Sequence, residues 1–188
     1  SSMTAAGPKQ NLILSLKGVG KNYGAVSALE SIDLDIFSGD VVALCGDNGA
    51  GKSSLIKIIS GAEEPTSGTL SINGRDVQFS SPQDALKQGV ATIYQDLALA
   101  PRLSIYENVF MGAELTRNVP GLPFLSILHK ARMKREAISY LKRLSIPISD
   151  ANRPVERLSG GQRQAVAICR ALLWNAKIII MDEPTAAL

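Results

Sequence analysis

The alternation of apolar and polar residues predicts strands of two kinds in the N-terminal half. From Ser31 to Phe37, isoleucine and leucine alternate with aspartate, the two-residue period of a half-solvated antiparallel strand. The run Val41 to Cys45 is apolar at every position, which is typical of a strand covered on both faces in a parallel sheet. Residues 69–72 and 75–79 flank Asn73-Gly74 and predict a hairpin. We therefore expect antiparallel strands beside one parallel-type strand.

The rest of the chain predicts helices between short apolar strands. The expected helices are 54–60, 81–88, 130–144 and 162–173, and the further strands are 11–16, 89–94 and 177–181. The 130–144 helix has one apolar stripe and otherwise basic faces. These charges indicate either a solvated surface or one that attracts an anionic membrane or an acidic partner. A Pro/Gly-rich loop, 118–123, divides this helical region.

Composition limits the classes of protein that this chain can belong to. Its 188 residues are 45% hydrophobic and 20% charged, as in a folded globular domain. A net charge of +3 is too small to make nucleic acid the main partner. No apolar run reaches the roughly 18 residues that a membrane-spanning helix needs. Cys45 and Cys169 are expected to be buried, reduced thiols, with a disulfide as the alternative. Residues 1–10 are expected to be a tag remnant or a flexible terminus.

A phosphate-binding loop is the strongest chemical signal. Residues 46–53 fit G-x-x-x-x-G-K-[ST] between an apolar strand and an apolar helix. Glycines let consecutive N–H groups face phosphate oxygens, and the helix N-terminus adds partial positive charge. Lys52 is expected between the β- and γ-phosphates, and the Ser53 hydroxyl on Mg²⁺. The expected nucleotide contacts here are Gly46, Asp47, Asn48, Gly49, Ala50, Gly51, Lys52, Ser53 and Ser54.

Two adjacent acids follow the apolar strand near the end of the chain. Asp182 is expected at the carboxyl end of that strand, in the Mg²⁺ shell. Glu183 is expected to polarise the water that attacks the γ-phosphate. Two neighbouring buried carboxylates are costly without a cation, so the pair itself favours Mg²⁺. Together with the phosphate loop, the acids indicate a nucleotide hydrolase.

The pentapeptide Leu158-Ser159-Gly160-Gly161-Gln162 completes a family pattern. With the two preceding motifs, it resembles the signature of the nucleotide-binding domains of ABC transporters. Its residues expose backbone donors at the start of a helix, a second anion site. The resemblance implies that Ser159, Gly160, Gly161 and Gln162 complete the ATP pocket of an opposite subunit. It also implies an α/β fold: a P-loop NTPase core with an antiparallel β subdomain and an inserted α-helical subdomain.

The resemblance assigns further residues. Tyr23 matches the aromatic side chain on which adenine stacks, and Gln95 matches the glutamine that reaches Mg²⁺ and the attacking water. The segment after Gln95 is where such domains receive their membrane partner. The implied catalytic residues are Glu183, Lys52 and Gln95, and the implied Mg²⁺ ligands are Ser53, Gln95 and Asp182.

The resemblance also implies a domain layout, and the chain departs from it. The ABC domain is expected over 11–188, with the β subdomain and core in 11–94 and 165–188 and the helical subdomain in 96–164. The family's histidine and aspartate that follow Glu183 have no counterpart here, and His129 is expected to be a surface residue instead. A strand of the central sheet is expected to be missing too. We therefore expect poor ATP hydrolysis, and folding with a swapped or rearranged neighbour.

Three stretches, 46–57, 81–112 and 181–188, resemble the ATPases of bacterial monosaccharide importers of the ribose, xylose and fructose type. At Gly112-Ala113-Glu114 the basic residue expected before the acid is absent. The resemblance implies a subunit that hydrolyses MgATP to power sugar import. Its implied partners are a second copy or second nucleotide-binding domain, transmembrane permease subunits and, indirectly, a periplasmic sugar-binding protein. The implied location is the cytoplasmic face of the bacterial inner membrane.

Other functions remain as alternatives. An ABC ATPase of DNA repair would carry a coiled coil or zinc module between phosphate loop and signature, and neither is present. An exporter ATPase is normally fused to transmembrane helices. An ABC ATPase for another substrate, or an ATP-binding fragment without turnover, also fits the motifs.

Overall fold

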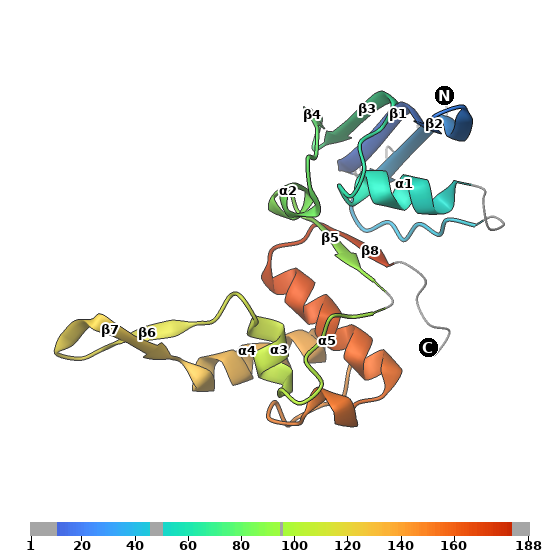
Figure 1. Cartoon of the computed structure of the whole chain (residues 1–188). Helices are drawn as coiled ribbons and strands as arrows, with labels where there is room; N and C mark the ends of the chain where they lie inside the picture. The colour runs from blue at the N-terminus through green and yellow to red at the C-terminus, as the bar shows by residue number, and fades with distance from the viewer. Residues whose placement is uncertain (1–10, 46–50, 95, 182–188) are drawn as a thin grey trace, which may run out of the picture. The chain divides into compact units, whose positions relative to one another are not determined.

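The computed structural model describes residues 11–45, 51–94 and 96–181, without the side chains of 122–125 (Figure 1). The chain forms two compact units, Ser1–Gln88 and Gly89–Leu188. Within the described part, no helix combines the length and the apolar character that crossing a membrane requires.

The first unit is built on an antiparallel sheet. Its strands are β1 (Leu12–Tyr23), β2 (Val26–Phe37), β3 (Ser67–Ile72) and β4 (Arg75–Val77), in the order β2-β1-β3-β4. Helix α1 (Lys52–Ile59) follows β2 in the chain, and α2 (Pro82–Lys87) follows β4. Leu14, Leu16 and Val19 of β1 are buried, as are Leu55 and Ile58 of α1. These side chains form the apolar core of the unit.

The predicted hairpin is confirmed, and the first two strands are longer than predicted. Asn73 and Gly74 adopt φ of 50° and 76° in the turn between β3 and β4. The β1–β2 pairing contains register shifts on either side of Val19, and Ser31 has a φ of 46°. Because each bulge shifts the two-residue period, the alternation of apolar residues breaks off before the strands end.

The prediction of a buried strand at Val41 to Cys45 is wrong. These residues form no strand, and Val41 is 98% exposed. An apolar run becomes a strand only when a neighbour pairs with its backbone, and none of the described strands does so. Cys45 is consequently exposed, against the expectation of a buried thiol, whereas Cys169 is buried as expected. Both thiols are free.

The second unit combines a short parallel sheet with a helical core. Strands β5 (Val90–Ile93) and β8 (Ile178–Met181) pair in parallel. Helices α3 (Ile105–Phe110), α4 (Lys130–Arg143) and α5 (Gly160–Leu173), with the 3-10 turn η1 (Val155–Arg157), surround one apolar cluster. Ile105, Val109, Ala137, Leu141 and Val166 are fully buried in that cluster. The unit is therefore held mainly by contacts between helices.

A hairpin replaces the predicted loop between the helices of this unit. Strands β6 (Thr116–Val119) and β7 (Leu122–Leu128) pair antiparallel and project from the helices (Figure 1). The predicted 118–123 loop is therefore the end of β6, the Pro120-Gly121 turn and the start of β7, with Gly121 at a φ of 82°. Pro-Gly is a turn signal, but the polar residues before it do not show a strand period.

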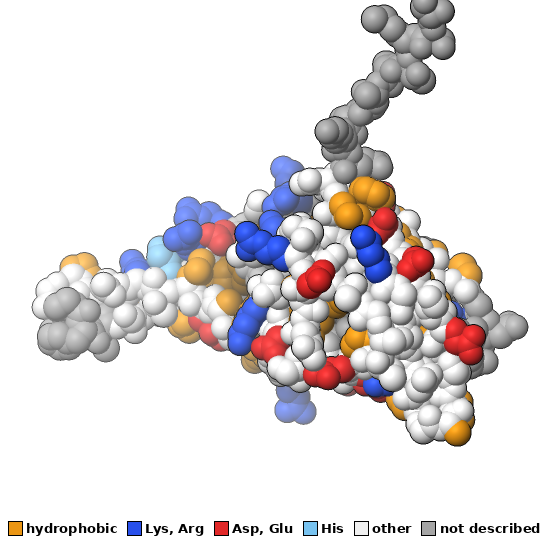
Figure 2. Space-filling model, turned by 90° about the horizontal axis from the view of Figure 1, so that it is seen from above, with side chains coloured by type: hydrophobic (Ala, Val, Ile, Leu, Met, Phe, Trp, Pro, Cys, Tyr) orange, Lys and Arg blue, Asp and Glu red, His pale blue; other side chains and the backbone are white. Residues whose placement is uncertain are grey.

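Helix α4 has the basic surface that its sequence predicts. Figure 2 shows Lys and Arg side chains gathered beside His129, the single histidine of the chain. Three of these cations are engaged within the unit: Arg132 with Glu136 at 2.7 Å, Lys134 over the Tyr106 ring and Arg143 over the Tyr140 ring. His129 caps the helix, because its Nδ1 accepts a hydrogen bond from the backbone N–H of Arg132 at 3.3 Å.

Candidate nucleotide site

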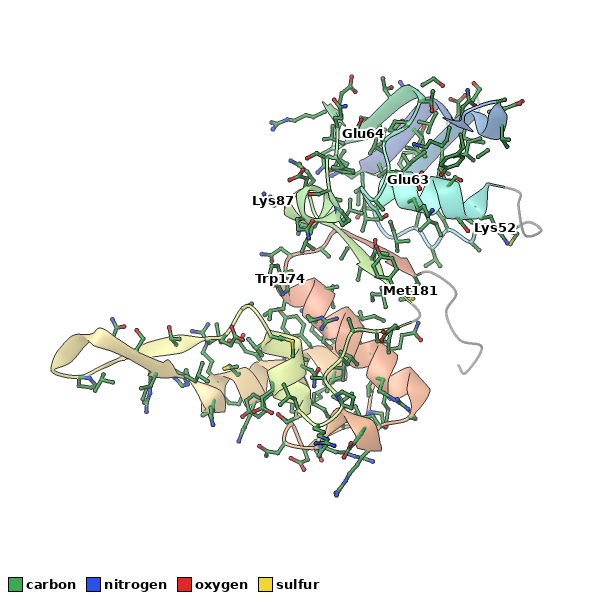
Figure 3. The ribbon with its side chains drawn as sticks, in the orientation of Figure 1. Lys52, Glu63, Glu64, Lys87, Trp174 and Met181 are labelled. Atoms are coloured by element: carbon green, nitrogen blue, oxygen red, sulfur yellow. The ribbon has the colours of Figure 1, made fainter. Side chains whose placement is uncertain are left out.

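The start of α1 has the backbone arrangement of a phosphate site. Gly51 is the N-cap with a φ of 87°, and its carbonyl accepts the first helical hydrogen bond, from the N–H of Leu55 at 2.9 Å. The N–H groups of Lys52, Ser53 and Ser54 therefore lie in the first turn, where a helix has no internal acceptors for them. Such N–H groups bind phosphate oxygens. Figure 3 shows Lys52 at this end of α1.

Only glycine fits at position 51. A Cβ atom there would lie 2.5 Å from the carbonyl oxygen of Ala28 and 2.6 Å from Cδ2 of Leu29. The positive φ is also strained for any residue with a Cβ. The glycine of the phosphate motif is thus required by close contact with β2, and it sets the direction in which α1 begins.

Tyr23 lies in an ionic cluster at the end of β1. Its hydroxyl donates a hydrogen bond to Oε2 of Glu63, and the ammonium of Lys21 lies 5.3 Å from the centre of its ring. Nζ of Lys57, from α1, donates to the other carboxylate oxygen of Glu63 at 3.0 Å. Nζ of Lys21 is 3.6 Å from Oε2 of Glu63 and donates to the backbone carbonyl of Glu64 at 2.7 Å.

The charges of this cluster stabilise one another. The hydrogen bond from Tyr23 and then that from Lys57 lower the pKa of Glu63 below its ordinary value. The hydrogen bond to Glu63 and its negative charge raise the pKa of Lys57. Glu63 is consequently an anion and Lys57 a cation throughout the neutral range.

The predicted signature forms the N-terminus of α5. Ser159 is the N-cap, and its hydroxyl accepts the N–H of Gln162 at 3.2 Å, while Oε1 of Gln162 accepts the N–H of Ser159 at 3.1 Å. This capping box uses two of the backbone donors. The N–H groups of Gly160 and Gly161 lie in the same first turn, where the helix supplies no acceptor, and they can bind an anion.

The segment after Gln95 is held by two helices. The Arg170 guanidinium of α5 donates to the carbonyl oxygens of Leu97 at 2.9 Å and Ala98 at 3.1 Å. The Asn108 side chain of α3 accepts the N–H of Ala100 at 2.7 Å and donates to its carbonyl at 3.1 Å. Asn108 is fully buried. Leu97 to Ala100 is thereby attached to the helical core of the second unit.

Several predicted residues lie outside the described part of the chain. They are Gly46, Asp47, Asn48, Gly49, Ala50, Gln95, Asp182 and Glu183. Among the residues that are described, no three His, Cys, Asp or Glu side chains are grouped to hold a metal ion. The catalytic and Mg²⁺ roles of Lys52, Ser53, Gln95, Asp182 and Glu183 remain predictions.

The sequence pattern of one known family, described as "ABC transporter", matches residues 29–186. The chain belongs to the ABC transporter family. Membership makes it an ATPase of the ABC type, and it confirms the family resemblance read from the sequence.

Curated relatives extend this match along most of the chain. The xylose/arabinose import ATP-binding protein XylG of Sulfolobus acidocaldarius is 52% identical over 176 residues, which are 94% of this chain and 67% of that protein. The fructose import ATP-binding protein FrcA of Rhizobium meliloti is 47% identical over 182 residues, covering 95% and 69%. The chain therefore spans about two thirds of these ABC proteins.

Solved ABC cassettes have the same fold. The ADP conformation of MJ1267, an ATP-binding cassette of an ABC transporter, superposes with a TM-score of 0.76 at 26% identity, over 94% of this chain and 70% of that one. The dimeric post-hydrolysis state of the cassette MJ0796, bound to ADP and Pi, superposes with a TM-score of 0.67 at 30% identity, over 94% and 76%. The predicted P-loop NTPase fold class is confirmed.

Several residues that hold Tyr23 and the segment after Gln95 lie outside the sequence motifs of this ABC ATPase. Lys21, Lys57 and Glu63 around Tyr23, and Asn108 and Arg170 beside the Gln95 segment, belong to none of the motifs. Their signal is spatial, because the Tyr23–Glu63 hydrogen bond joins residues 40 positions apart. The one local signal is the pair of acids Glu63-Glu64, which follows soon after α1 in the sequence.

Proposed function

We propose that this chain is the ATP-binding subunit of an ABC importer for a monosaccharide. The proposal that the chain binds ATP is supported mainly by the start of α1. Position 51 accepts only glycine there, and Lys52 and Ser53 lie in the first turn of the helix. The sugar part is supported by the two curated relatives, whose names give xylose or arabinose and fructose as the imported compounds. ATP is the substrate in this proposal, and the imported sugar does not touch the chain.

The proposed roles follow the chemistry of each residue. Tyr23 stacks on the adenine, and the backbone from Gly46 to Ser54 holds the phosphates, with the Lys52 ammonium against the β- and γ-phosphates. Glu183 accepts a proton from the attacking water. Ser53, Gln95 and Asp182 would hold Mg²⁺, which when bound neutralises charge on the phosphate oxygens. Lys52 stabilises the charge that develops as the γ-phosphate leaves.

The proposed assembly is a dimer on a membrane transporter. Ser159, Gly160, Gly161 and Gln162 of one copy face the phosphate loop of a second copy or second nucleotide-binding domain. The dimeric solved cassette supports this arrangement. The Leu97 to Ala100 segment would contact the permease subunits, and a periplasmic sugar-binding protein would act through them. The chain would lie at the cytoplasmic face of the membrane, with its core in 11–94 and 165–188 and its helical subdomain in 96–164.

Calorimetric titration of MgATP into the purified chain tests the nucleotide site. Lys52→Ala removes the cation that faces the phosphates, so we expect its Kd to rise about tenfold or more, roughly 1.4 kcal/mol of binding free energy. Lys87→Ala is the matched control, because Lys87 is a lysine of the same unit whose side chain is 77% exposed and lies 3.6 Å from Asp84 in α2. Equal MgATP affinity in both variants would remove Lys52 from the site.

Reconstitution tests the sugar assignment. The chain is combined with its permease subunits in proteoliposomes, and ATP-dependent uptake of labelled xylose, arabinose and fructose is measured against a labelled amino acid. Uptake of a sugar supports the proposal. Uptake of the amino acid alone would place the chain in another class of importer.

A further inference from the structure

We propose that Glu63 is a positioning residue for the nucleobase, because its carboxylate fixes the Tyr23 ring and ties that ring to the helix that carries Lys52. This inference rests on the proposed function, since it takes Tyr23 as the residue on which adenine stacks. Glu63 itself touches neither base nor phosphate in the proposal. It acts through Tyr23.

The contacts of Glu63 connect two elements of the first unit. One carboxylate oxygen accepts the hydrogen bond from the Tyr23 hydroxyl, at the end of β1. The other oxygen accepts from Nζ of Lys57, in α1, at 3.0 Å. The Glu63 side chain is 23% exposed, so the contacts are partly shielded from water. One side chain therefore links the strand that ends in the aromatic ring to the helix that begins at the phosphate motif.

The Tyr23 ring is partly exposed, with a cation over it. Lys21 places its ammonium 5.3 Å from the ring centre and is itself held by the Glu64 carbonyl at 2.7 Å. A cation occupies one face of an aromatic ring at this distance. Tyr23 is 44% exposed. A flat base can stack on an aromatic ring that is exposed to this extent. The hydroxyl bond to Glu63 holds the outer end of the side chain and so restricts its swing about the Cα–Cβ bond.

The link also sets the spacing between base and phosphates. Lys57 follows Lys52 by five positions in α1, about 7.5 Å along the helix axis. Figure 3 shows Lys52 at the beginning of α1 and Glu63 near the opposite end of the helix. If Glu63 is lost, the outer end of the Tyr23 side chain is no longer held, and the ring can move relative to Lys52. ATP must then order the ring on binding, which weakens its affinity.

A ligand that has the phosphates of ATP but no base distinguishes this positioning role from general support of the phosphate site. Glu63→Ala is compared with the wild-type chain by calorimetric titration of MgATP and of magnesium tripolyphosphate. We expect the Kd for MgATP to rise roughly threefold to tenfold and the Kd for tripolyphosphate to stay unchanged. Glu63→Gln keeps an acceptor for the Tyr23 hydroxyl and should recover part of the loss.

Glu64→Ala is the matched control, because Glu64 holds Lys21 through its backbone carbonyl, which alanine keeps. Its MgATP affinity should equal that of the wild type. Unchanged MgATP affinity in Glu63→Ala overturns the inference and leaves the proposed function intact. An equal loss for MgATP and tripolyphosphate also overturns it, since Glu63 would then support the phosphate site. Absence of MgATP binding in the wild type, folded by circular dichroism, would overturn the proposed function itself.

Discussion

The two cysteines show how surroundings decide the chemistry of a single residue. Cys169 is buried in the helical core of the second unit, and burial raises the pKa of its thiol to about 12. Cys45 is exposed in the run after β2. Because the thiolate is the reactive form, a thiol that stays protonated at neutral pH is inert.

We expect Ellman's reagent at pH 8 to titrate one thiol in the native chain and two in guanidinium chloride. The thiol that reacts in the native chain is that of Cys45, so the reaction should disappear in Cys45→Ser. Cys169→Ser should leave it unchanged. Rapid modification of both thiols in the folded chain would contradict the burial of Cys169.

Helix α3 depends on its cap because it has only six residues. A helix this short does not persist by its own hydrogen bonds. The hydroxyl of Ser104 donates to Oε2 of Glu107 at 2.6 Å, and the N–H of Ser104 donates to the same oxygen at 2.9 Å. These bonds lower the pKa of Glu107. The cap holds the helix whose Asn108 binds Ala100.

Ser104→Ala should reduce the free energy of unfolding by about 1 kcal/mol at neutral pH. A carboxyl with a lowered pKa contributes its stability above its ordinary pKa, and loses it as pH falls through the lowered value. The difference in the free energy of unfolding between the wild type and Ser104→Ala should therefore become smaller at acidic pH. Urea unfolding at several pH values measures it. The control is Ser139→Ala, a change at an exposed position of α4, which should leave the free energy of unfolding unchanged. If the loss of stability in Ser104→Ala were the same at every pH, Glu107 would not contribute to it.

The sequence predicts helices better than strands in this chain. Helices such as α4 and α5 satisfy their own backbone, so a local pattern determines them. A strand needs a partner elsewhere in the sequence, which is why Val41 to Cys45 looked like a strand and is not one. The polar β6 strand showed no apolar period at all. The phosphate and signature motifs were readable because glycines and a cap are local requirements, whereas the Glu63 link joins distant positions.

The molecule as a whole consists of two units that are each continuous in sequence. One has its core in the strands and helix of residues 11–88, and the other in helices that contribute the apolar cluster of residues 105–169. Cores with separate sets of side chains can lose their packing at different temperatures.

We expect differential scanning calorimetry to resolve two unfolding transitions. Leu14→Ala and Leu141→Ala remove equally buried leucines, one from each unit, and should each lower one transition only. Each change should cost about 2–5 kcal/mol in its own unit. A single transition, shifted alike by both variants, would show that the units unfold as one.

The bond between Tyr23 and Glu63 also bears on which nucleotides the chain accepts. Hydrogen bonding to the edge of a base is what distinguishes adenine from guanine, whereas stacking is available to any base with a flat face. In this chain the Tyr23 hydroxyl is already given to Glu63. If adenine stacks on Tyr23 as proposed, the ring contributes stacking while its hydroxyl proton is held by Glu63 and cannot be donated to the edge of the base. The relative abundance of nucleotides in the cell, more than selection by a donor at this residue, would then decide which nucleotide is used.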